Sequence, residues 1–181
     1  NAPLTIGLAK AAAREFKKQG LDIRLGAKVS KAEVKGEEVH LTYTDAKGEQ
    51  SLVVDRLLVA VGRRAATQNL LAEGTGVTLN ARGQIEVDAH CRTKAPNVYA
   101  IGDIVAGTPQ LAHVATMEGM VAVARIAGKT ATPINKNRIP GATYTEPGIG
   151  SVGLTEAQAR AQGYKVKVGK FPFGGNSRAI A

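Results

Sequence analysis

The sequence predicts a mixed fold that combines α/β and α+β regions. The chain has 181 residues, of which 21 are glycine, and it is rich in alanine and valine, a composition that fits an α/β protein with many tight turns. An amphipathic helical segment near the start is followed by several short β-forming segments separated by turn sequences. Further along, a short apolar strand delivers a glycine and an aspartate ahead of a long helical segment.

The composition is that of an ordinary globular protein and gives no sign of a membrane segment. Hydrophobic residues make up 44% of the chain and charged residues 22%, which is common among soluble domains. No window of about 18 apolar residues occurs, so a membrane span is not expected. The first residues, Asn-Ala-Pro-Leu-Thr, lack the basic start and apolar stretch of a signal peptide. We therefore expect a cytoplasmic protein.

The chain is basic, with a formal net charge of +9, which is a feature of many nucleic-acid-binding proteins. The lysines and arginines are spread along the chain, however, and no basic run contains interleaved aromatic residues. Charge without a recognition motif is a weak indication, so we expect no nucleic-acid partner. The three histidines, His40, His90 and His113, lack the spacing of metal ligands, and no metal site is predicted.

A helix is expected over residues 4–19. Leu8, Ala12 and Phe16 share one face of this helix, and the basic residues lie elsewhere. Gly20 follows the last helical residue, where glycine commonly ends a helix.

A small antiparallel meander is expected next, because short segments rich in β-formers alternate with turn sequences. The turns are Lys35-Gly-Glu and Asp45-Ala-Lys-Gly. The expected strands cover residues 22–25, 29–34, 39–44 and 51–54. The continuously apolar run 57–61 predicts a further strand that is buried on both faces.

Helical and extended segments alternate through the middle of the chain. A short helical piece at 69–73 precedes two expected strands, 84–87 and 98–101. The helix expected at 111–127 is mainly apolar and small, so we expect it to pack on a sheet. Residues 130–138 predict a linker.

The last part of the chain predicts extended segments around one short helix. Residues 142–145 are expected to be extended. Thr155 and Gln158 form a capping-box sequence that starts a helix through Ala161. Residues 164–171 predict a final strand.

The most informative motif lies between the strand expected at 98–101 and the long helix. The strand delivers Gly102 and Asp103 to its carboxyl end, and the helix begins at Leu111. Glycine permits a close approach of a ligand because it has no side chain, and the carboxylate can accept hydrogen bonds from a sugar or polyol hydroxyl. The N-terminal end of the helix would face the same ligand. Asp103 could instead cap a helix or turn, but the surrounding pattern favours a ligand.

Two side chains near this motif allow a functional and a structural interpretation. As a general base, His113 would need an orienting carboxylate and exposure to substrate; the sequence supplies neither, so we favour a histidine that contacts a cofactor or neighbouring residues. Cys91 is the only cysteine, so this chain contains no dithiol pair. His90 and Arg92 could lower its pKa, but an incidental thiol in a reducing compartment is favoured.

A second motif, Val59-Ala-Val-Gly-Arg-Arg, follows the apolar run. Its two arginines, Arg63 and Arg64, can pair with phosphates or carboxylates through bidentate hydrogen bonds. They could equally hold a domain junction together. The sequence leaves both interpretations open.

These motifs together resemble the flavoprotein disulfide reductases of the pyridine nucleotide-disulfide oxidoreductase family. The stretch from Thr93 to Asp103 resembles the second flavin-binding motif, and the Leu-Ala-His that begins at Leu111 is most similar to the dihydrolipoamide dehydrogenase group. The motif ending at Arg64 resembles the exit from the NAD-binding domain, and Tyr144-Thr-Glu-Pro the start of the dimerisation domain. The loop after the aspartate is one residue longer than is typical of the family.

The resemblance implies part of a protein with two Rossmann-like dinucleotide-binding domains, followed by the start of an α+β dimerisation domain. The implied division is 1–62 for the NAD-binding domain, 63–132 for the returning segment of the FAD-binding domain, and 133–181 for the dimerisation domain. The implied cofactors are FAD and NAD, with Asp103 holding the ribityl chain of FAD and Gly62 near the nicotinamide cofactor. The residues implied to contact FAD are Gly102, Asp103, Gln110, Leu111, Ala112 and His113.

The implied activity is the oxidation of protein-bound dihydrolipoamide with NAD as acceptor. The implied partners are a second copy, forming a homodimer, and the lipoyl-bearing acyltransferase of a 2-oxoacid dehydrogenase complex. These 181 residues lack the family's glycine-rich fingerprints, redox cysteine pair and C-terminal His-Pro-Thr motif, so no catalytic residue is assigned, and we expect them to be inactive by themselves. Two alternatives stay open: a sibling reductase acting on glutathione or mercury, and a non-catalytic dimerisation module.

Overall fold

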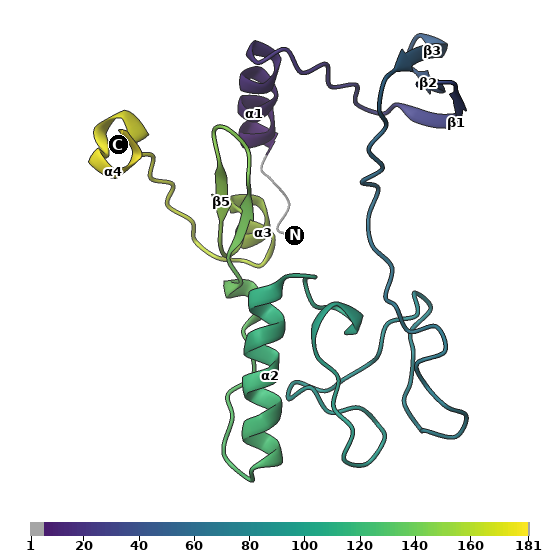
Figure 1. Cartoon of the computed structure of the whole chain (residues 1–181). Coiled ribbons are helices and arrows are strands. Elements are labelled where there is room, and N and C mark those ends of the chain that lie inside the picture. The colour runs from purple at the N-terminus through teal and green to yellow at the C-terminus, as the bar shows by residue number, and fades with distance from the viewer. Residues whose placement is uncertain (1–5, 181) are drawn as a thin grey trace. The chain divides into compact units, whose positions relative to one another are not determined.

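The computed structural model describes residues 6–180, which fall into two compact units, residues 6–64 and residues 65–180 (Figure 1). The first unit contains one helix and a three-stranded sheet. The second contains a long helix, a two-stranded sheet and several short helical turns, joined by irregular segments. Helices and strands are therefore mixed, as the sequence predicts.

The helix predicted over residues 4–19 is confirmed as α1, Ile6–Lys18; residues 4 and 5 lie outside the described residues. Gly20 ends it in the left-handed conformation, with φ of 87°. The N–H of Gly20 donates to the carbonyl of Lys17 at 3.1 Å, and the N–H of Leu21 donates to that of Phe16 at 3.0 Å. This pair of bonds is the Schellman motif, which only glycine enters without a steric cost.

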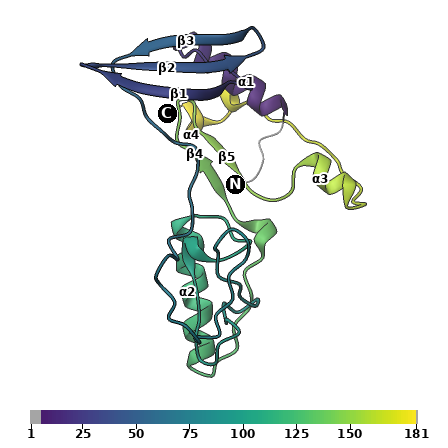
Figure 2. The same ribbon diagram turned by 90° about the vertical axis from the view of Figure 1, so that its right-hand side faces the viewer.

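The predicted meander is confirmed as the antiparallel sheet β1–β2–β3 (Figure 2). Its strands are β1 (Lys28–Lys35), β2 (Glu38–Asp45) and β3 (Gly48–Val54). Leu41 and Tyr43 on the central strand are its most buried residues, at 8% and 5% exposure. The guanidinium of Arg24 lies 5.2 Å from the centre of the Tyr43 ring, so a cation–π contact covers part of this apolar face.

Two strands predicted in the first unit are wrong. Residues 22–25 are irregular, and Asp22 instead pairs with Arg24 at 2.7 Å. The apolar run 57–61 is extended but is not part of a sheet. Leu58 and Val61 are 90% and 94% exposed rather than buried. A strand buried on both faces needs flanking strands and covering helices, and the described residues supply none to this segment.

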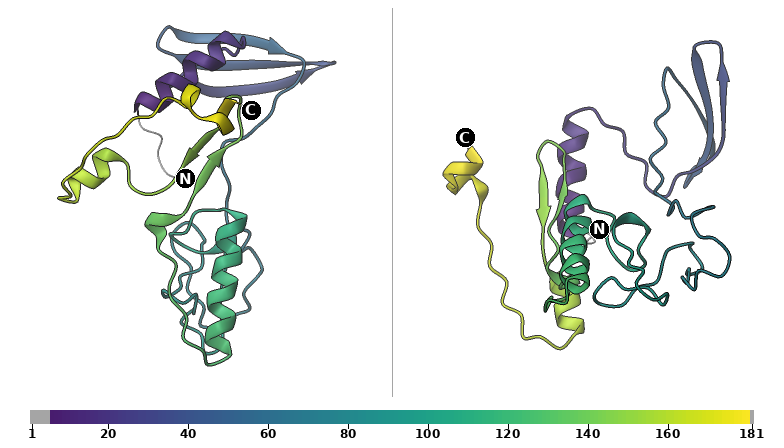
Figure 3. Two further views of the ribbon diagram at one scale, coloured as in Figure 1. Left: turned by 90° about the vertical axis from the view of Figure 1, so that its left-hand side faces the viewer. Right: turned by 60° about the horizontal axis from the view of Figure 1, so that its bottom comes forward.

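The predicted long helix is confirmed as α2, Ala112–Ile126. Its buried side contains Val114, Glu118, Val121 and Ala122. The helix lies beside the irregular segments of the same unit (Figure 3). It contacts the short 3-10 turn η1, Gly102–Ile104. The expectation that the helix packs on a sheet is therefore wrong, since the described residues place irregular chain there.

Ile85, Ala100 and Val105 form a small core in the second unit, with Val77, Val87 and Ile104 packed against it. Ile85 makes an antiparallel bridge to Leu79 and a parallel bridge to Val105, and Tyr99 bridges to Arg92. The strands predicted at 84–87 and 98–101 are thus reduced to isolated bridges, because turns on either side carry the chain away after each contact.

The remainder of the second unit is built from short elements. The extended segment expected at 142–145 forms β4, Gly141–Thr143, which pairs antiparallel with β5, Ile149–Ser151. The predicted capping box starts α3, Glu156–Ala161: the N–H of Gln158 donates to Thr155 Oγ1 at 3.3 Å, and the N–H of Thr155 donates to Gln158 Oε1 at 2.9 Å. Three short pieces complete the unit: η2 (Lys136–Arg138), η3 (Phe173–Gly175) and α4 (Ser177–Ile180).

Two further expectations in this unit are wrong. Residues 69–73 form turns rather than a helix, and Asn69 takes a left-handed φ of 58° that a right-handed helix does not continue through. Residues 164–171 form no strand, since no described segment pairs with them. Within the described part of the chain, every helix is too short or too polar to cross a membrane.

Candidate functional site

The predicted motif at Gly102 and Asp103 forms a tight turn beside the start of α2. The extended chain passes through buried Ala100 and enters η1, where the N–H of Val105 donates to the carbonyl of Gly102 at 3.0 Å. Gly102 has a φ of 79°, in the left-handed region that side chains disfavour. A Cβ at this position would lie 3.5 Å from that of Ala115, an ordinary contact. Glycine is therefore favoured here by the backbone conformation and not by a lack of space for a side chain.

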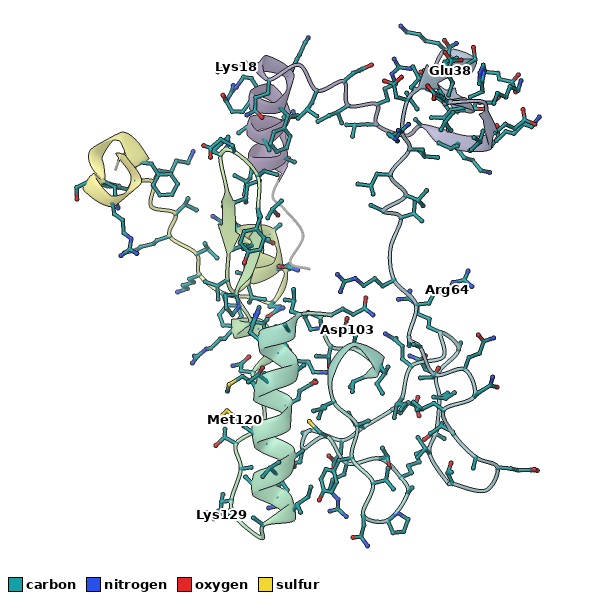
Figure 4. All side chains as sticks on the ribbon, viewed as in Figure 1. Lys18, Glu38, Arg64, Asp103, Met120 and Lys129 are labelled. Carbon is teal, nitrogen blue, oxygen red and sulfur yellow. The ribbon has the colours of Figure 1, made fainter. Side chains whose placement is uncertain are left out.

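Asp103 is exposed at this turn, and Figure 4 shows it next to the N-terminal end of α2. The amide of Gln110 donates to the main-chain carbonyl of Asp103 at 3.1 Å. The structure therefore brings together Gly102, Asp103 and Gln110, although the intervening loop is one residue longer than is typical of the resembled family.

The N-terminal end of α2 completes this arrangement. Leu111 is the N-cap residue, and its side chain caps nothing. Its carbonyl accepts the N–H groups of both Val114 and Ala115, at 3.0 and 3.1 Å. The N–H groups of Ala112 and His113 precede the intrahelical hydrogen bonds, as the first amides of every helix do. They give this end of the helix a partial positive charge that favours anionic or electron-rich groups.

His113 makes a structural contact rather than a catalytic one. Its Nε2 atom lies 3.0 Å from the carbonyl oxygen of Pro140. A carbonyl only accepts hydrogen bonds, so Nε2 carries the hydrogen and donates. This bond ties the start of α2 to the segment before β4. The favoured interpretation of His113, a helix-start histidine that contacts its neighbours, agrees with this geometry.

Glu118 belongs to this site but is not among the residues predicted from the sequence. Its side chain lies on the buried side of α2 with only 4% exposure, and its Oε2 accepts the N–H of Gly102 at 2.7 Å. A signal existed: Glu118 is the only acidic residue in a helix that is otherwise mainly apolar and small. The contact spans sixteen positions of sequence, so local patterning could not supply its partner.

Gly62 and the two arginines belong to the other unit, residues 6–64. Gly62 has a φ of 129°, and the space around its α-carbon is open. It lies near the end of the exposed, extended segment that closes with Arg63 and Arg64; Arg64 is labelled in Figure 4. An open glycine in extended chain is compatible with close approach by a planar ligand.

Cys91 is buried, at 5% exposure, in a turn with a φ of 67°. Burial, reinforced by the charges of Glu118 and Asp88, raises the pKa of its thiol to about 11. The alternative in which His90 and Arg92 lower this pKa is wrong, because burial of the thiol raises it. The favoured interpretation as an unreactive thiol fits the structure.

A cavity of about 190 Å³ lies beside the N-cap of α2. Apolar residues form much of its lining, including Leu111, Ile139 and Leu154, and Lys136 and Gln158 contribute polar groups. Sites for drug-sized ligands and cofactors usually have about 300–1,000 Å³, so this cavity is too small to enclose a dinucleotide. Gly102 and Asp103 do not line this cavity; their turn and the α2 terminus form an open wall on which Asp103 is exposed. Among residues 6–180, no group of three or more potential ligands is placed to hold a metal ion.

Comparison with protein families places this chain in a known class. Residues 3–119 match the family model described as pyridine nucleotide-disulphide oxidoreductase. Residues 139–181 match the model for the dimerisation domain of the same family. The chain therefore belongs to the pyridine nucleotide-disulphide oxidoreductase family, and the family and fold class inferred from the sequence are confirmed.

Among curated relatives, the chain is most usefully compared with dihydrolipoyl dehydrogenases. It is 46% identical over 175 residues to that of Cupriavidus necator, covering 96% of this chain and 36% of the relative. It is 43% identical over 175 residues to the mitochondrial dihydrolipoyl dehydrogenase of Homo sapiens, covering 95% of this chain and 34% of the relative. The chain thus spans about a third of the length of the curated relatives that it matches.

Solved structures of the same class share the fold. An HOCl-induced flavoprotein disulfide reductase from Escherichia coli, in a Cu(II) complex, superposes with a TM-score of 0.85 at 29% identity, covering 99% of this chain and 41% of that one. LpdA from Mycobacterium tuberculosis gives a TM-score of 0.85 at 26% identity, covering 95% of this chain and 37% of that one.

Proposed function

We propose that this chain is part of a dihydrolipoyl dehydrogenase, which oxidises protein-bound dihydrolipoamide with NAD as electron acceptor. Identities of 43–46% to dihydrolipoyl dehydrogenases over nearly the whole chain support this choice within the family. In this reaction the dihydrolipoamide dithiol loses two electrons and two protons and becomes a disulfide. NAD⁺ takes up the electron pair as hydride, and one proton is released.

The observation that carries the proposal is the joined arrangement of the Gly102–Asp103 turn, Gln110 and the start of α2. A dinucleotide cofactor with a polyol chain fits this wall: the exposed Asp103 carboxylate can accept hydrogen bonds from its hydroxyls, and Gly102 offers no side chain to obstruct it. We infer that FAD is that cofactor. When bound, FAD accepts an electron pair from a dithiol and passes it to NAD.

The residues of this chain orient the cofactor and adjust its electrostatics. Asp103 holds the ribityl hydroxyls, and Gln110 fixes the turn that carries it. The backbone N–H groups at Ala112 and His113, next to Leu111, would stabilise negative charge on a flavin held at this end of the helix. Gly62, which has no side chain, would allow the nicotinamide cofactor to approach the backbone of the unit formed by residues 6–64.

The proposal extends to partners and location. The match of residues 139–181 to a dimerisation domain supports a homodimer. A dihydrolipoamide substrate carried on protein supports a lipoyl-bearing acyltransferase of a 2-oxoacid dehydrogenase complex as the partner. We place the protein in the cytoplasm, on the basis of its free thiol, which is typical of reducing compartments.

The test uses the longest natural polypeptide that contains this chain. We expect it to purify yellow, with the absorbance of bound flavin, and to form NADH with dihydrolipoamide. Asp103→Ala should lose most of its flavin, whereas Glu73→Ala, which removes an exposed acid elsewhere in the same unit, should retain it. Turnover with glutathione disulfide but not with dihydrolipoamide would identify a sibling reductase instead. A colourless, folded dimer would identify a non-catalytic module.

A further inference from the structure

The buried side chain of Glu118 calls for an explanation, because carboxyl groups are costly to bury unless they are hydrogen-bonded. Glu118 is 4% exposed, and within the described part of the chain its carboxyl forms no ion pair. Its bond to the N–H of Gly102 is short, at 2.7 Å. Other buried positions on the same face of α2, Val114 and Val121, hold apolar residues, so packing alone does not require an acid.

Together with two other contacts, this bond holds Gly102 in place. Glu118 holds its N–H at 2.7 Å, and its carbonyl accepts the N–H of Val105 at 3.0 Å. Its α-carbon faces Ala115 of α2, whose Cβ would be 3.5 Å from an added side chain. Glycine is the residue whose backbone has the most conformational freedom to lose. The hydrogen bond from its N–H to Glu118 therefore restricts the backbone conformation at a position where glycine would otherwise be flexible.

Asp103 follows Gly102 directly, so the orientation of its carboxylate depends on the backbone that Glu118 fixes. The carbonyl of Asp103 is held separately by Gln110 at 3.1 Å. With the peptide held on both sides of its α-carbon, the Cα–Cβ bond of Asp103 leaves the turn in one direction, which limits the positions that the exposed carboxylate can reach. A hydrogen-bonding group must be oriented to within about 10–20° to bind well.

We propose that Glu118 is a positioning residue for the cofactor site: by accepting the N–H of Gly102 it orients Asp103 toward the flavin hydroxyls, without touching the cofactor. This inference rests on the proposed function, because FAD is the ligand that Asp103 is taken to hold. The role differs from core packing, which would depend on the volume of the side chain and not on its acceptor oxygen.

The experiment compares three variants of the longest natural polypeptide, stripped of flavin and titrated with FAD by fluorescence quenching. Glu118→Met keeps the volume but removes the acceptor, and Glu118→Gln keeps an acceptor oxygen. Val121→Ala, one turn along the same buried face, disturbs packing without touching Gly102. We expect FAD to bind about tenfold more weakly to Glu118→Met, and within about threefold of the parent for the other two.

A second readout does not depend on flavin. In the flavin-free parent, the Gly102 amide should be protected from hydrogen exchange; Glu118→Met should lose this protection and Glu118→Gln should keep it. If Glu118→Met does not fold, the parent still decides, because rapid exchange of its Gly102 amide would overturn the inference.

The outcomes separate the two proposals. Equal FAD affinity in Glu118→Met and the parent, or equal weakening in Val121→Ala, would overturn the positioning role alone. Failure of the parent to bind FAD would overturn the proposed function and this inference with it.

Discussion

The side-chain amide of Gln110 donates to the main-chain carbonyl of Asp103 across 3.1 Å, although seven positions separate them in sequence. The intervening loop is thereby closed on itself. The start of α2 and the aspartate turn are therefore held together by a side chain as well as by the packing of the helix on η1.

Removing this bond should loosen the turn. Gln110→Ala deletes a single neutral hydrogen bond at a surface loop, an interaction that contributes about 0.5–1.5 kcal/mol. In the proposed flavoprotein, this corresponds to FAD binding that is about two- to tenfold weaker. Titration of the flavin-free protein with FAD measures the effect. Gln162→Ala, on the exposed end of α3, is the matched control, and an equal loss there would show that the bond is irrelevant.

The left-handed conformation of Gly102 predicts the cost of a side chain at this turn. Gly102→Ala should destabilise the native state by about 1–2 kcal/mol, because the conformation itself is unfavourable for alanine, whereas the space is sufficient. Gly119→Ala is the control: Gly119 lies inside α2, and its added Cβ would also meet only an ordinary contact at 3.5 Å. That variant should be neutral or more stable. Urea denaturation distinguishes them, and equal losses would contradict the conformational argument.

The capping box predicts a local effect at α3. Thr155→Ala removes the oxygen that accepts the N–H of Gln158, and such a loss costs about 1 kcal/mol of helix stability. Hydrogen exchange of the α3 amides should accelerate, while exchange in α2 stays unchanged. Thr130→Ala, at an exposed position outside any helix, should alter neither; acceleration in both helices would point to global destabilisation instead.

The buried thiol of Cys91 predicts a pH dependence. Burial, with the charges of Glu118 and Asp88, raises its pKa from 9.0 to about 11. The native state then holds the thiol proton more tightly than the unfolded state does. Native stability is undiminished by this group below pH 9.0, and it decreases as the pH rises from there through about 11. Alkylation by iodoacetamide should accordingly be slow at neutral pH and accelerate toward pH 11.

The control for this pH dependence is Cys91→Ala. Because lysines and tyrosines also titrate in alkaline solution, only the difference between the parent and this variant reports the thiol. An identical loss of stability with rising pH in both proteins would contradict a role for Cys91. Rapid alkylation of the native protein at neutral pH would contradict its burial.

Features encoded by neighbouring residues could be predicted from the sequence. The helix end at Gly20, the capping box at Thr155 and the turns of the meander each depend on a few consecutive side chains. The start of α2 could likewise be predicted, because a glycine and an aspartate before an apolar helix form a local pattern.

Features that depend on distant partners could not be predicted. The run 57–61 has the composition of a buried strand, yet a strand is stabilised by neighbours that its own residues do not encode. The bond from Glu118 to Gly102 joins two elements, and nothing next to either residue in the sequence reveals the other. Hydrophobic content predicts the tendency of a segment to be buried; what it is buried against is a property of the whole fold.

The glycine that ends α1 has counterparts after α2 and α3. Gly128 and Gly163 also take left-handed conformations, with φ of 70° and 83°. In each case the residue after the glycine donates back to the helix, Lys129 at 2.8 Å and Tyr164 at 3.0 Å. Each helix length is therefore set by its own last few residues. Isolated helices this short are marginal in water, because most helical stability comes from tertiary packing. The glycine ends therefore determine where each helix stops, and the packing of the rest of the fold determines whether it forms.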